Sequence, residues 1–300
     1  MSNKMDPAPG ARPARAGAVE TGTRHLLATR ASGVLTLTLN RPDVRNAFSR
    51  EMLEALAAML DLAARAADVR VVVLEGAGGV FCAGGDLGML AAGESIFGPA
   101  AEPEVRLATQ KALQRATVAR LHEMDKPSIA LIDGPAVGAG LGLALACDLR
   151  YAGASATLRT GFGRLGLAGD FGCTWLLHRL VGPSRALELL YFSPPVPASR
   201  ARDLGLVTDV LPDDRLRARV GELAARLAAA SPDAVRAMKE HVARAHGAGL
   251  AACADAEAER HVRLLETGAH RDAVRALARG RTTRPPSTRP PSTTENPGAD

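Results

Sequence analysis

Two buried strands, each followed by a glycine loop and a helix, constrain this 300-residue chain more than any other feature. The first strand is the β-branched run Val69–Glu75, which is followed by GAGGVFCAGGDLGML. The second is Ser128–Asp133, which is followed by GPAVGAGLGLALA. A short apolar run bounded by glycine is typical of a strand that is buried on both faces. The repeat predicts an α/β fold with both glycine loops at one end of a sheet.

The remaining sequence predicts further strands and helices around these two units. His25–Asn40 predicts a hairpin that turns at Ser32–Gly33. The spacing of apolar residues predicts helices in both Ala47–Ala67 and Val105–Met124. After the second glycine loop we expect a short strand, two short helices at Thr174–Leu180 and Ser184–Phe192, and a last strand at Leu206–Leu211.

Composition divides the chain into four segments. Residues 1–22 are rich in Pro, Ala, Gly and Arg, which predicts a disordered arm. Residues 23–212 carry the strand and loop patterns and form the expected core. Residues 213–280 are dominated by Ala and Arg and are expected to be helical, with breaks at Ser231–Pro232 and Gly247. Residues 281–300 contain TRPPST twice and predict a disordered tail.

The net charge of +5 raises the question of a nucleic-acid partner. The chain has only six Phe, two Tyr and one Trp, and its arginines are spread along helices and tails rather than gathered in one stripe. A mild excess of Arg suits a phosphorylated small ligand equally well. We therefore expect no nucleic-acid partner.

The cellular location is predicted from apolar runs and cysteines. The longest apolar runs, such as Leu141–Cys147, are too short to span a bilayer, and the N-terminal residues have no apolar core of a secretory signal. The four cysteines show no CxxC spacing, which favours a reducing cytosol and predicts no zinc site. We expect a cytoplasmic protein without a membrane partner or a bound metal.

The two glycine loops are the first candidates for chemistry. Gly84, Gly85 and Asp86 follow one buried strand, and Gly138, Ala139 and Gly140 follow the other. One backbone N–H from each loop could converge on a carbonyl oxygen, and removing one donor of such an oxyanion hole costs about 3 kcal/mol in the barrier. The alternative is that both loops are tight turns needed only for packing.

Asp170, in the segment LAGDFGCTW, is the second candidate. It could supply acid–base chemistry across from the second glycine loop. It could instead be the N-cap of a helix whose first turn is Phe171–Thr174, because Asp is a preferred capping residue. Spacing alone favours the cap, and the two roles do not exclude each other.

Other reactive residues give weaker signals. His178 lies within a predicted helix and is interpreted as a core or surface residue. Cys82 and Cys173 lie near the loops, but no His or Asn partner for a thiolate nucleophile is evident. No serine has G-x-S-x-G spacing. Gly161, Gly163 and Gly166 have G-x-G-x-x-G spacing without the strand-to-helix context of a dinucleotide site, so NAD is not expected.

Several motifs in order resemble the crotonase family, the enoyl-CoA hydratases and isomerases, from about Leu27 to Arg279. They are LNRPDVRNAFS, VRVVVLEGAGGVFCAGGDL, KPSIALIDGPAVGAGLGLALACDLRYA and LGLAGDFGCTWLLHRLVG. The resemblance implies a spiral of ββα units with a C-terminal helical region that contributes to trimer formation or forms a lid. It also implies a homotrimer or dimer of trimers, and an acyl-CoA thioester substrate. It places the thioester oxygen between the N–H groups of Gly85 and Ala139.

The resemblance also implies the residues that bind the substrate and its CoA part. Arg45 falls where the family often has a basic side chain near the CoA phosphates. The other positions are Ala47, Ala83, Gly84, Asp86, Leu87, Gly138 and Phe162. Coenzyme A is then part of the substrate, and no separate cofactor is expected.

Two departures from the family pattern bear on the reaction. Two-carboxylate hydratases of the family have glutamates where this chain has Gly142 and, approximately, Phe162. Asp170 remains, as in family members that have an aspartate before this helix. A 1,3-proton shift needs one base, whereas syn hydration needs two groups. An enoyl-CoA isomerase is therefore favoured, while a hydratase or a non-catalytic acyl-CoA-binding protein stays open.

Overall fold

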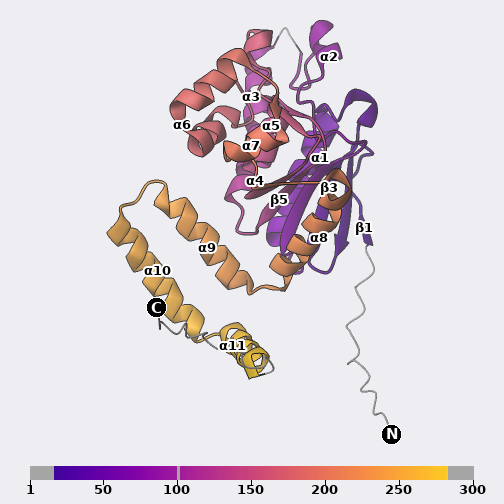
Figure 1. Ribbon diagram of the computed structural model, residues 1–300. Helices are drawn as coiled ribbons and strands as arrows, with labels where there is room; N and C mark the ends of the chain where they lie inside the picture. Colours follow the sequence, from indigo (N-terminus) through magenta and orange to yellow (C-terminus); the bar gives the residue numbers. More distant parts are fainter. Residues whose placement is uncertain (1–16, 100–101, 283–300) are drawn as a thin grey trace, which may run out of the picture. The chain divides into compact units, whose positions relative to one another are not determined.

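The computed structural model describes residues 17–99 and 102–282 (Figure 1). The chain divides into two compact units between Glu240 and His241. Of the region 213–280, which the sequence predicts to be helical, the first unit takes α8 (Asp213–Ala229) and most of α9 (Pro232–Ala245). The predicted boundary between 212 and 213 stays a prediction.

A seven-stranded sheet forms the centre of the first unit, with the strand order β1-β2-β3-β4-β5-β7-β10. The first two pairs are antiparallel and the remaining four are parallel. The strands are β1 (Gly17–Val19), β2 (Leu26–Ala31), β3 (Val34–Leu39), β4 (Val71–Gly76), β5 (Ser128–Ile132), β7 (Leu149–Gly153) and β10 (Asp209–Leu211). Both predicted buried strands, β4 and β5, are buried along their whole length, so the α/β prediction is confirmed.

The N-terminal edge of the sheet contains one confirmed prediction and one difference. The predicted hairpin is β2 and β3, which turn at Ser32 and Gly33, both at positive φ. Residues 17–22 belong to the predicted disordered arm. In the structure the first three of these residues form β1, which pairs with β2 and places Gly17 opposite Arg30. The sequence did not indicate this strand, because backbone pairing to an existing strand needs no apolar pattern. Residues 1–16 lie outside the described residues.

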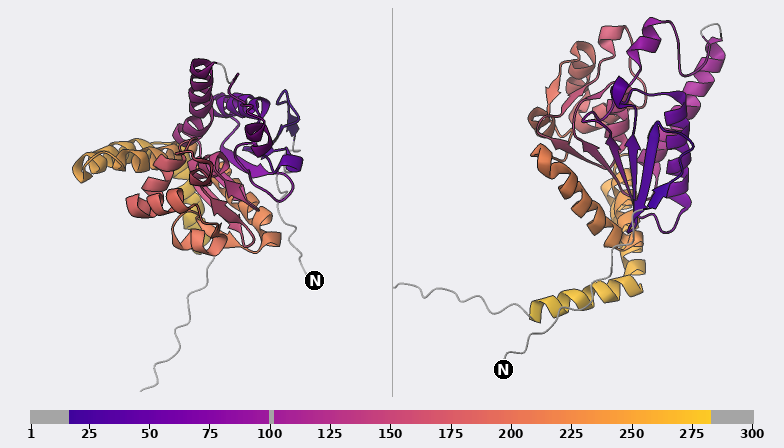
Figure 2. Two further views of the ribbon diagram at one scale, coloured as in Figure 1. Left: turned by 90° about the horizontal axis from the view of Figure 1, so that it is seen from above. Right: turned by 90° about the vertical axis from the view of Figure 1, so that its right-hand side faces the viewer.

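Two helical layers cover the sheet. Val71, Val73, Ile129 and Leu131 face Leu216, Val220 and Ala224 of α8. The opposite face packs against α1 (Arg50–Arg65), α4 (Arg120–Glu123) and α5 (Ala139–Ala146) in the larger core. The right-hand view of Figure 2 shows the strands between α8, in orange, and α1, in purple. Helix α1 begins after Ser49, whose Oγ accepts the Met52 N–H at 3.1 Å.

The helix predicted at Val105–Met124 is interrupted. Helix α3 spans Pro103–Gln114, a π-helical turn spans Arg115–Ala119, and α4 completes the run. Single π turns inside helices are rare and often lie at functional sites. Periodicity did not reveal this turn, because the buried residues Leu113, Thr117 and Leu121 keep the four-residue spacing of an ordinary α-helix across it.

The segment after β7 carries the Asp170 loop. A small sheet contains β6 (Ala136–Val137), β8 (Thr157–Arg159) and β9 (Val196–Pro197). Helix α6 spans Cys173–Phe192 with a non-helical Gly182 (φ 74°), which corresponds to the break between the two predicted short helices. The last predicted strand is shorter than expected, since only Asp209–Leu211 pairs. The short elements η1, α2, η3 and α7 span Pro42–Val44, Leu87–Ala91, Gly163–Leu165 and Ala198–Asp203.

The second unit contains α10 (Leu250–Leu265) and α11 (Gly268–Thr282) after the end of α9. The break predicted at Gly247 is present, and a further break follows at Thr267, whose Oγ1 accepts the His270 N–H at 3.2 Å. In the described residues, no helix combines the length and hydropathy that a membrane span requires. The predicted tail lies outside the described residues except for its first two positions, which end α11.

Candidate active site

The two glycine loops are in direct contact. Cys82 and Ala136 form a parallel bridge, in which Val137 N–H donates to the Cys82 carbonyl at 2.9 Å. A Cβ on Gly84 would lie 2.6 Å from the Val137 carbonyl oxygen and 3.1 Å from the Ala139 nitrogen. Glycine is therefore required at position 84, where φ is +80°, for the loops to approach this closely.

The backbone N–H groups of the loops differ in their partners. Gly138 N–H donates to the Arg159 carbonyl at 2.9 Å, and Gly84 N–H donates to Cys82 Sγ at 3.3 Å. Among the contacts of the described residues, the N–H groups of Gly85 and Ala139 reach no protein acceptor. Ala139 is the first residue of α5, so its N–H has no intrahelical partner and lies at the positive end of the helix dipole. These two groups are available to an oxyanion.

A cavity of about 700 Å³ lies in front of both loops. Its volume falls in the range of small-molecule sites. Gly85, Ala139 and Asp170 all line it, from three separate segments of the chain. The predicted binding residues Ala83, Asp86, Leu87, Gly138 and Phe162 line it as well.

Three predicted binding residues do not line this cavity. Arg45 is exposed and takes a left-handed conformation (φ 54°) after η1. Ala47 is buried, with 2% of its surface exposed, and Gly84 is buried against the second glycine loop. The structure thus places Ala47 and Gly84 in supporting positions, and the contact of Arg45 with a CoA phosphate stays a prediction.

Asp170 is not a helix cap. The N-cap of α6 is Gly172, and the helix begins at Cys173. Asp170 Oδ1 is buried, and no donor in the described part of the chain reaches it. The capping interpretation was wrong because Phe171 and Gly172 both take positive φ, at 46° and 68°, which delays the first helical turn by two residues.

Burial controls the acidity of Asp170. Desolvation raises its pKa from 3.8 to about 6, and no charged neighbour among the described residues contributes. A carboxyl group with this pKa is largely ionised at neutral pH yet is a stronger base than an ordinary aspartate. Perturbed carboxyl groups in a cleft are typical of functional sites.

Phe171, the residue after Asp170, also lines the cavity. Phe171 is buried and its ring lies 5.1 Å from the Phe48 ring and 6.4 Å from the Phe97 ring, centroid to centroid. A Cβ on Gly142 would lie 2.5 Å from the Phe171 carbonyl oxygen. The Asp170–Gly172 segment therefore occupies the space into which a side chain at position 142 would project.

Sequence reasoning missed two residues that hold the first glycine loop. Arg41 Nη2 lies 3.4 Å from Asp86 Oδ2, and both side chains are mostly buried. Asn46 is fully buried at φ 54° and donates to the carbonyls of Ala77 and Val80 at 2.8 and 2.6 Å. The signal available in the sequence was an Asn in a polar turn, because Asn is enriched at positive φ.

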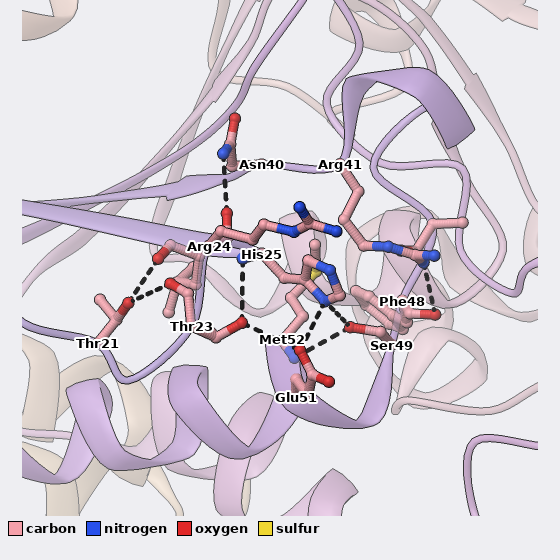
Figure 3. A network of polar contacts seen from close by, with 12 residues as sticks. Thr21, Thr23, Arg24, His25, Asn40, Arg41, Phe48, Ser49, Glu51 and Met52 are labelled. Atoms are coloured by element: carbon pink, nitrogen blue, oxygen red, sulfur yellow. Dashed lines mark hydrogen bonds and ion pairs between the residues drawn. The ribbon is translucent and has the colours of Figure 1, made fainter.

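A second polar cluster surrounds the start of α1 (Figure 3). His25 Nδ1 lies 2.9 Å from Ser49 Oγ and 3.2 Å from Glu51 Oε2. A nucleophilic triad needs the two ring nitrogens to serve the hydroxyl and the carboxylate separately. Here one nitrogen makes both contacts, and Ser49 Oγ caps the helix, so this cluster orders the N-terminus of α1.

The remaining reactive candidates lack the properties of nucleophiles. All four cysteines are free thiols. Burial raises the pKa of both the Cys82 and the Cys173 thiol to about 12, which leaves almost no thiolate at neutral pH. His178 is exposed on α6 and does not line the cavity. Within the described residues no group of His, Cys, Asp and Glu is arranged to hold a metal ion.

Comparisons with known proteins agree with this geometry. The sequence profile of enoyl-CoA hydratase/isomerase matches residues 29–282. A Mycobacterium tuberculosis protein named as a probable enoyl-CoA hydratase is 42% identical over 206 residues, covering 69% of this chain and 76% of the relative. The Escherichia coli 1,2-epoxyphenylacetyl-CoA isomerase is 38% identical over 196 residues, covering 65% of this chain and 73% of the relative.

A similar solved structure carries a ligand. It is a Thermobifida fusca protein named as an enoyl-CoA hydratase in complex with acetoacetyl-CoA, with a TM-score of 0.75 and 34% identity, covering 81% of this chain and 96% of that one. The fold predicted from the resemblance, a crotonase-type spiral, is confirmed. The relatives carry both hydratase and isomerase names. On its motifs, fold and profile match, this chain belongs to the enoyl-CoA hydratase/isomerase family.

Proposed function

We propose that this protein is an enoyl-CoA isomerase that moves a double bond through an enolate, with Asp170 as the only proton carrier. The observation that carries the proposal is the Asp170 carboxyl group. It lines the same cavity as Gly85 and Ala139, its Oδ1 has no partner among the described residues, and burial raises its pKa to about 6.

The proposed reaction uses the two backbone N–H groups and the Asp170 carboxylate in successive steps. The thioester oxygen of a 3-enoyl-CoA accepts hydrogen bonds from the N–H groups of Gly85 and Ala139. Asp170 removes a proton from Cα, and the electrons move into a dienolate whose charge rests on the thioester oxygen. The protonated Asp170 then returns the proton to Cγ, which leaves a 2-enoyl-CoA and regenerates the carboxylate.

The residues at two other positions support isomerisation over hydration. Syn hydration needs one group to deprotonate water and another to protonate Cα. Gly142 has no side chain, and Phe162 is an apolar cavity residue, so neither position supplies a second acid or base. The acyl-CoA class of substrate is supported by family membership and by the acetoacetyl-CoA complex of the Thermobifida fusca protein.

The test compares two substrates with the same acyl chain. The purified protein is incubated separately with a 3-enoyl-CoA and the corresponding 2-enoyl-CoA, and products are followed by mass and by the conjugated-thioester absorbance. We expect conversion of the 3-enoyl ester without addition of water. Efficient hydration of the 2-enoyl ester without isomerisation would instead make this protein a hydratase.

A non-catalytic acyl-CoA-binding protein is the other alternative. In deuterated water, a working oxyanion hole and base exchange Cα protons of a bound acyl-CoA even when no double bond moves. We expect exchange with the wild type and none with Asp170→Asn, while both bind the ester. Binding without exchange in the wild type would identify a passive pocket.

We also propose that the chain assembles as a homotrimer or a dimer of trimers. Tyr191 and Phe192 at the end of α6 are 68% and 74% exposed, and large apolar side chains exposed together mark interaction surfaces. Sedimentation equilibrium should give three or six copies, and a monomer at micromolar concentration would contradict the proposal. The proposed reaction uses no cofactor beyond the CoA of its substrate, and the free cysteines support a cytoplasmic location.

A further inference from the structure

Gln114 connects helix α3 to the Asp170 segment. It is the last residue of α3, directly before the π-helical turn, and its Oε1 accepts the Phe171 N–H at 2.8 Å. The two residues are 57 positions apart in the sequence. This bond therefore depends on the tertiary packing of the helix against the loop.

The segment that donates this hydrogen bond is held in an unfavourable conformation. A bulky residue at φ 46° is sterically strained, and the surrounding structure must offset that strain. Packing of the Phe171 ring against Phe48 offsets part of it. A Cβ on Gly172 would lie 3.2 Å from Cγ1 of Val118, a residue of the π turn, so the same helix also packs against the next residue.

The Phe171 N–H is also the nearest backbone donor after Asp170 in the sequence. Aspartate side chains often accept N–H groups of the residues that follow them. Other aspartates in the described residues do so: Asp209 accepts the Val210 N–H at 2.8 Å, and Asp86 accepts the Gly88 N–H at 3.1 Å. At Asp170 the corresponding donor is engaged by Gln114, and Oδ1 has no partner among the described residues.

We propose that Gln114 is a positioning residue that withholds the Phe171 N–H from Asp170 and so keeps the Asp170 carboxyl group unpartnered in the substrate cavity. The inference rests on the proposed role of Asp170 as the proton carrier. It also explains why the Asp170 carboxyl group does not accept the backbone N–H of the residue that follows it. It also assigns a role to the transition from α-helix to π-helix, which presents Gln114 and Val118 to the same loop.

The expected consequence concerns the acidity of Asp170. A hydrogen bond from a backbone N–H stabilises a carboxylate and lowers its pKa. Burial alone raises the pKa of Asp170, which agrees with a carboxyl group that receives no such bond. The other charged or titratable groups around the cavity and next to this segment are Asp86, Glu94, Arg106, Arg159, Arg164 and Cys173.

The test follows the protonation of Asp170 without substrate. Infrared difference spectra between wild type and Asp170→Asn, recorded across pH, give the midpoint of this one carboxyl group. The same measurement is made with Gln114→Met, which keeps the length of the side chain but removes the acceptor. Gln114→Glu keeps an acceptor for the Phe171 N–H. Gln110→Met makes the same chemical change one helical turn earlier, at a residue that also lines the cavity but has no hydrogen bond to residues 170–172 in the described part of the chain.

We expect Gln114→Met to lower the midpoint by about one pH unit, because the released N–H can now bind the carboxylate. Gln114→Glu and Gln110→Met should not lower it. Turnover of a 3-enoyl-CoA by Gln114→Met should fall about tenfold at pH 7 with KM changed less than threefold, because the base is weaker and less well directed.

An unchanged midpoint in folded Gln114→Met would overturn the inference, whatever happens to thermal stability. If Gln114→Met does not fold, Gln114→Asn replaces it, because its shorter side chain keeps the amide but cannot reach Phe171. A shifted midpoint in a protein that isomerises no 3-enoyl-CoA would support the inference about Gln114 while contradicting the proposed function. Failure of the inference about Gln114 and failure of the proposed function are therefore distinguishable.

Discussion

The backbone carbonyl of Phe171 lies where a side chain on Gly142 would begin. The 2.5 Å separation between that oxygen and an ideal Cβ on Gly142 is shorter than any normal contact. Position 142 follows Ala139, which we propose for the oxyanion hole, by about one turn of α5. The Asp170 segment and a carboxylate at position 142 therefore exclude each other, and this chain has the first arrangement.

We predict that Gly142→Ala destabilises the protein by about 1–3 kcal/mol, because the added methyl group meets backbone and not a movable side chain. Urea denaturation measures the change. The matched control is Gly221→Ala in α8, where an added Cβ meets nothing within 4 Å. That control should gain about 0.5–1 kcal/mol from lower chain entropy and better helix propensity. Equal effects of the two substitutions would contradict the steric argument.

We predict that kcat/KM for isomerisation depends on one ionisation near pH 6. Asp170 must be a carboxylate to remove the proton, and burial raises its pKa to about 6. The rate should rise about tenfold per pH unit below the midpoint and level off above it, since kcat/KM reports the free enzyme. A profile measured between pH 4.5 and pH 9 with a stable, non-reacting CoA ester as the binding control provides the check. A midpoint near pH 4 would mean that water reaches the Asp170 carboxyl group and that burial does not raise its pKa.

We predict that Asp170→Asn is more stable than the wild type at pH 8 and nearly equal to it at pH 4. In the folded protein the pKa of Asp170 is raised from 3.8 to about 6, so between these pH values the folded state binds more protons than the unfolded state. Stability therefore decreases as pH rises through this window, by about 3 kcal/mol in total, and stays lower above it. The asparagine removes this loss.

Denaturant titrations of both proteins at the two pH values measure this difference. Asp209→Asn is the matched control, because Asp209 is exposed and its carboxylate accepts a backbone N–H. It should not become more stable with rising pH relative to the wild type. If the difference in unfolding free energy between wild type and Asp170→Asn does not depend on pH, burial does not shift the pKa of this carboxyl group.

We predict that replacing the Ala139 amide by an ester lowers kcat about 10²–10³-fold, because it removes one donor to the developing oxyanion. The substitution leaves helix α5 intact, since the N–H of its first residue has no intrahelical partner. Stopped-flow kinetics and ligand binding are measured on the same sample. Affinity for a saturated acyl-CoA should change less than threefold, and an unaltered kcat would exclude Ala139 from the oxyanion hole.

Local sequence patterns determined much of the fold by themselves. The two apolar runs form the central strands β4 and β5, and the glycines after them form the touching loops. Ser32–Gly33 correctly located the hairpin turn, and Gly182 separates two helical runs. These features are readable because strand periodicity, turn chemistry and helix breaks depend on residues close together in the chain.

Only the tertiary structure decided what Asp170 is. Its spacing favoured a helix cap, whereas packing shifts the helix start to Cys173 and buries Oδ1 without a partner among the described residues. The hydrogen bond from Phe171 to Gln114 joins residues 57 positions apart, and burial supplies the whole pKa shift. Desolvation and long-range hydrogen bonds arise from three-dimensional packing, so no local pattern in the sequence reports them.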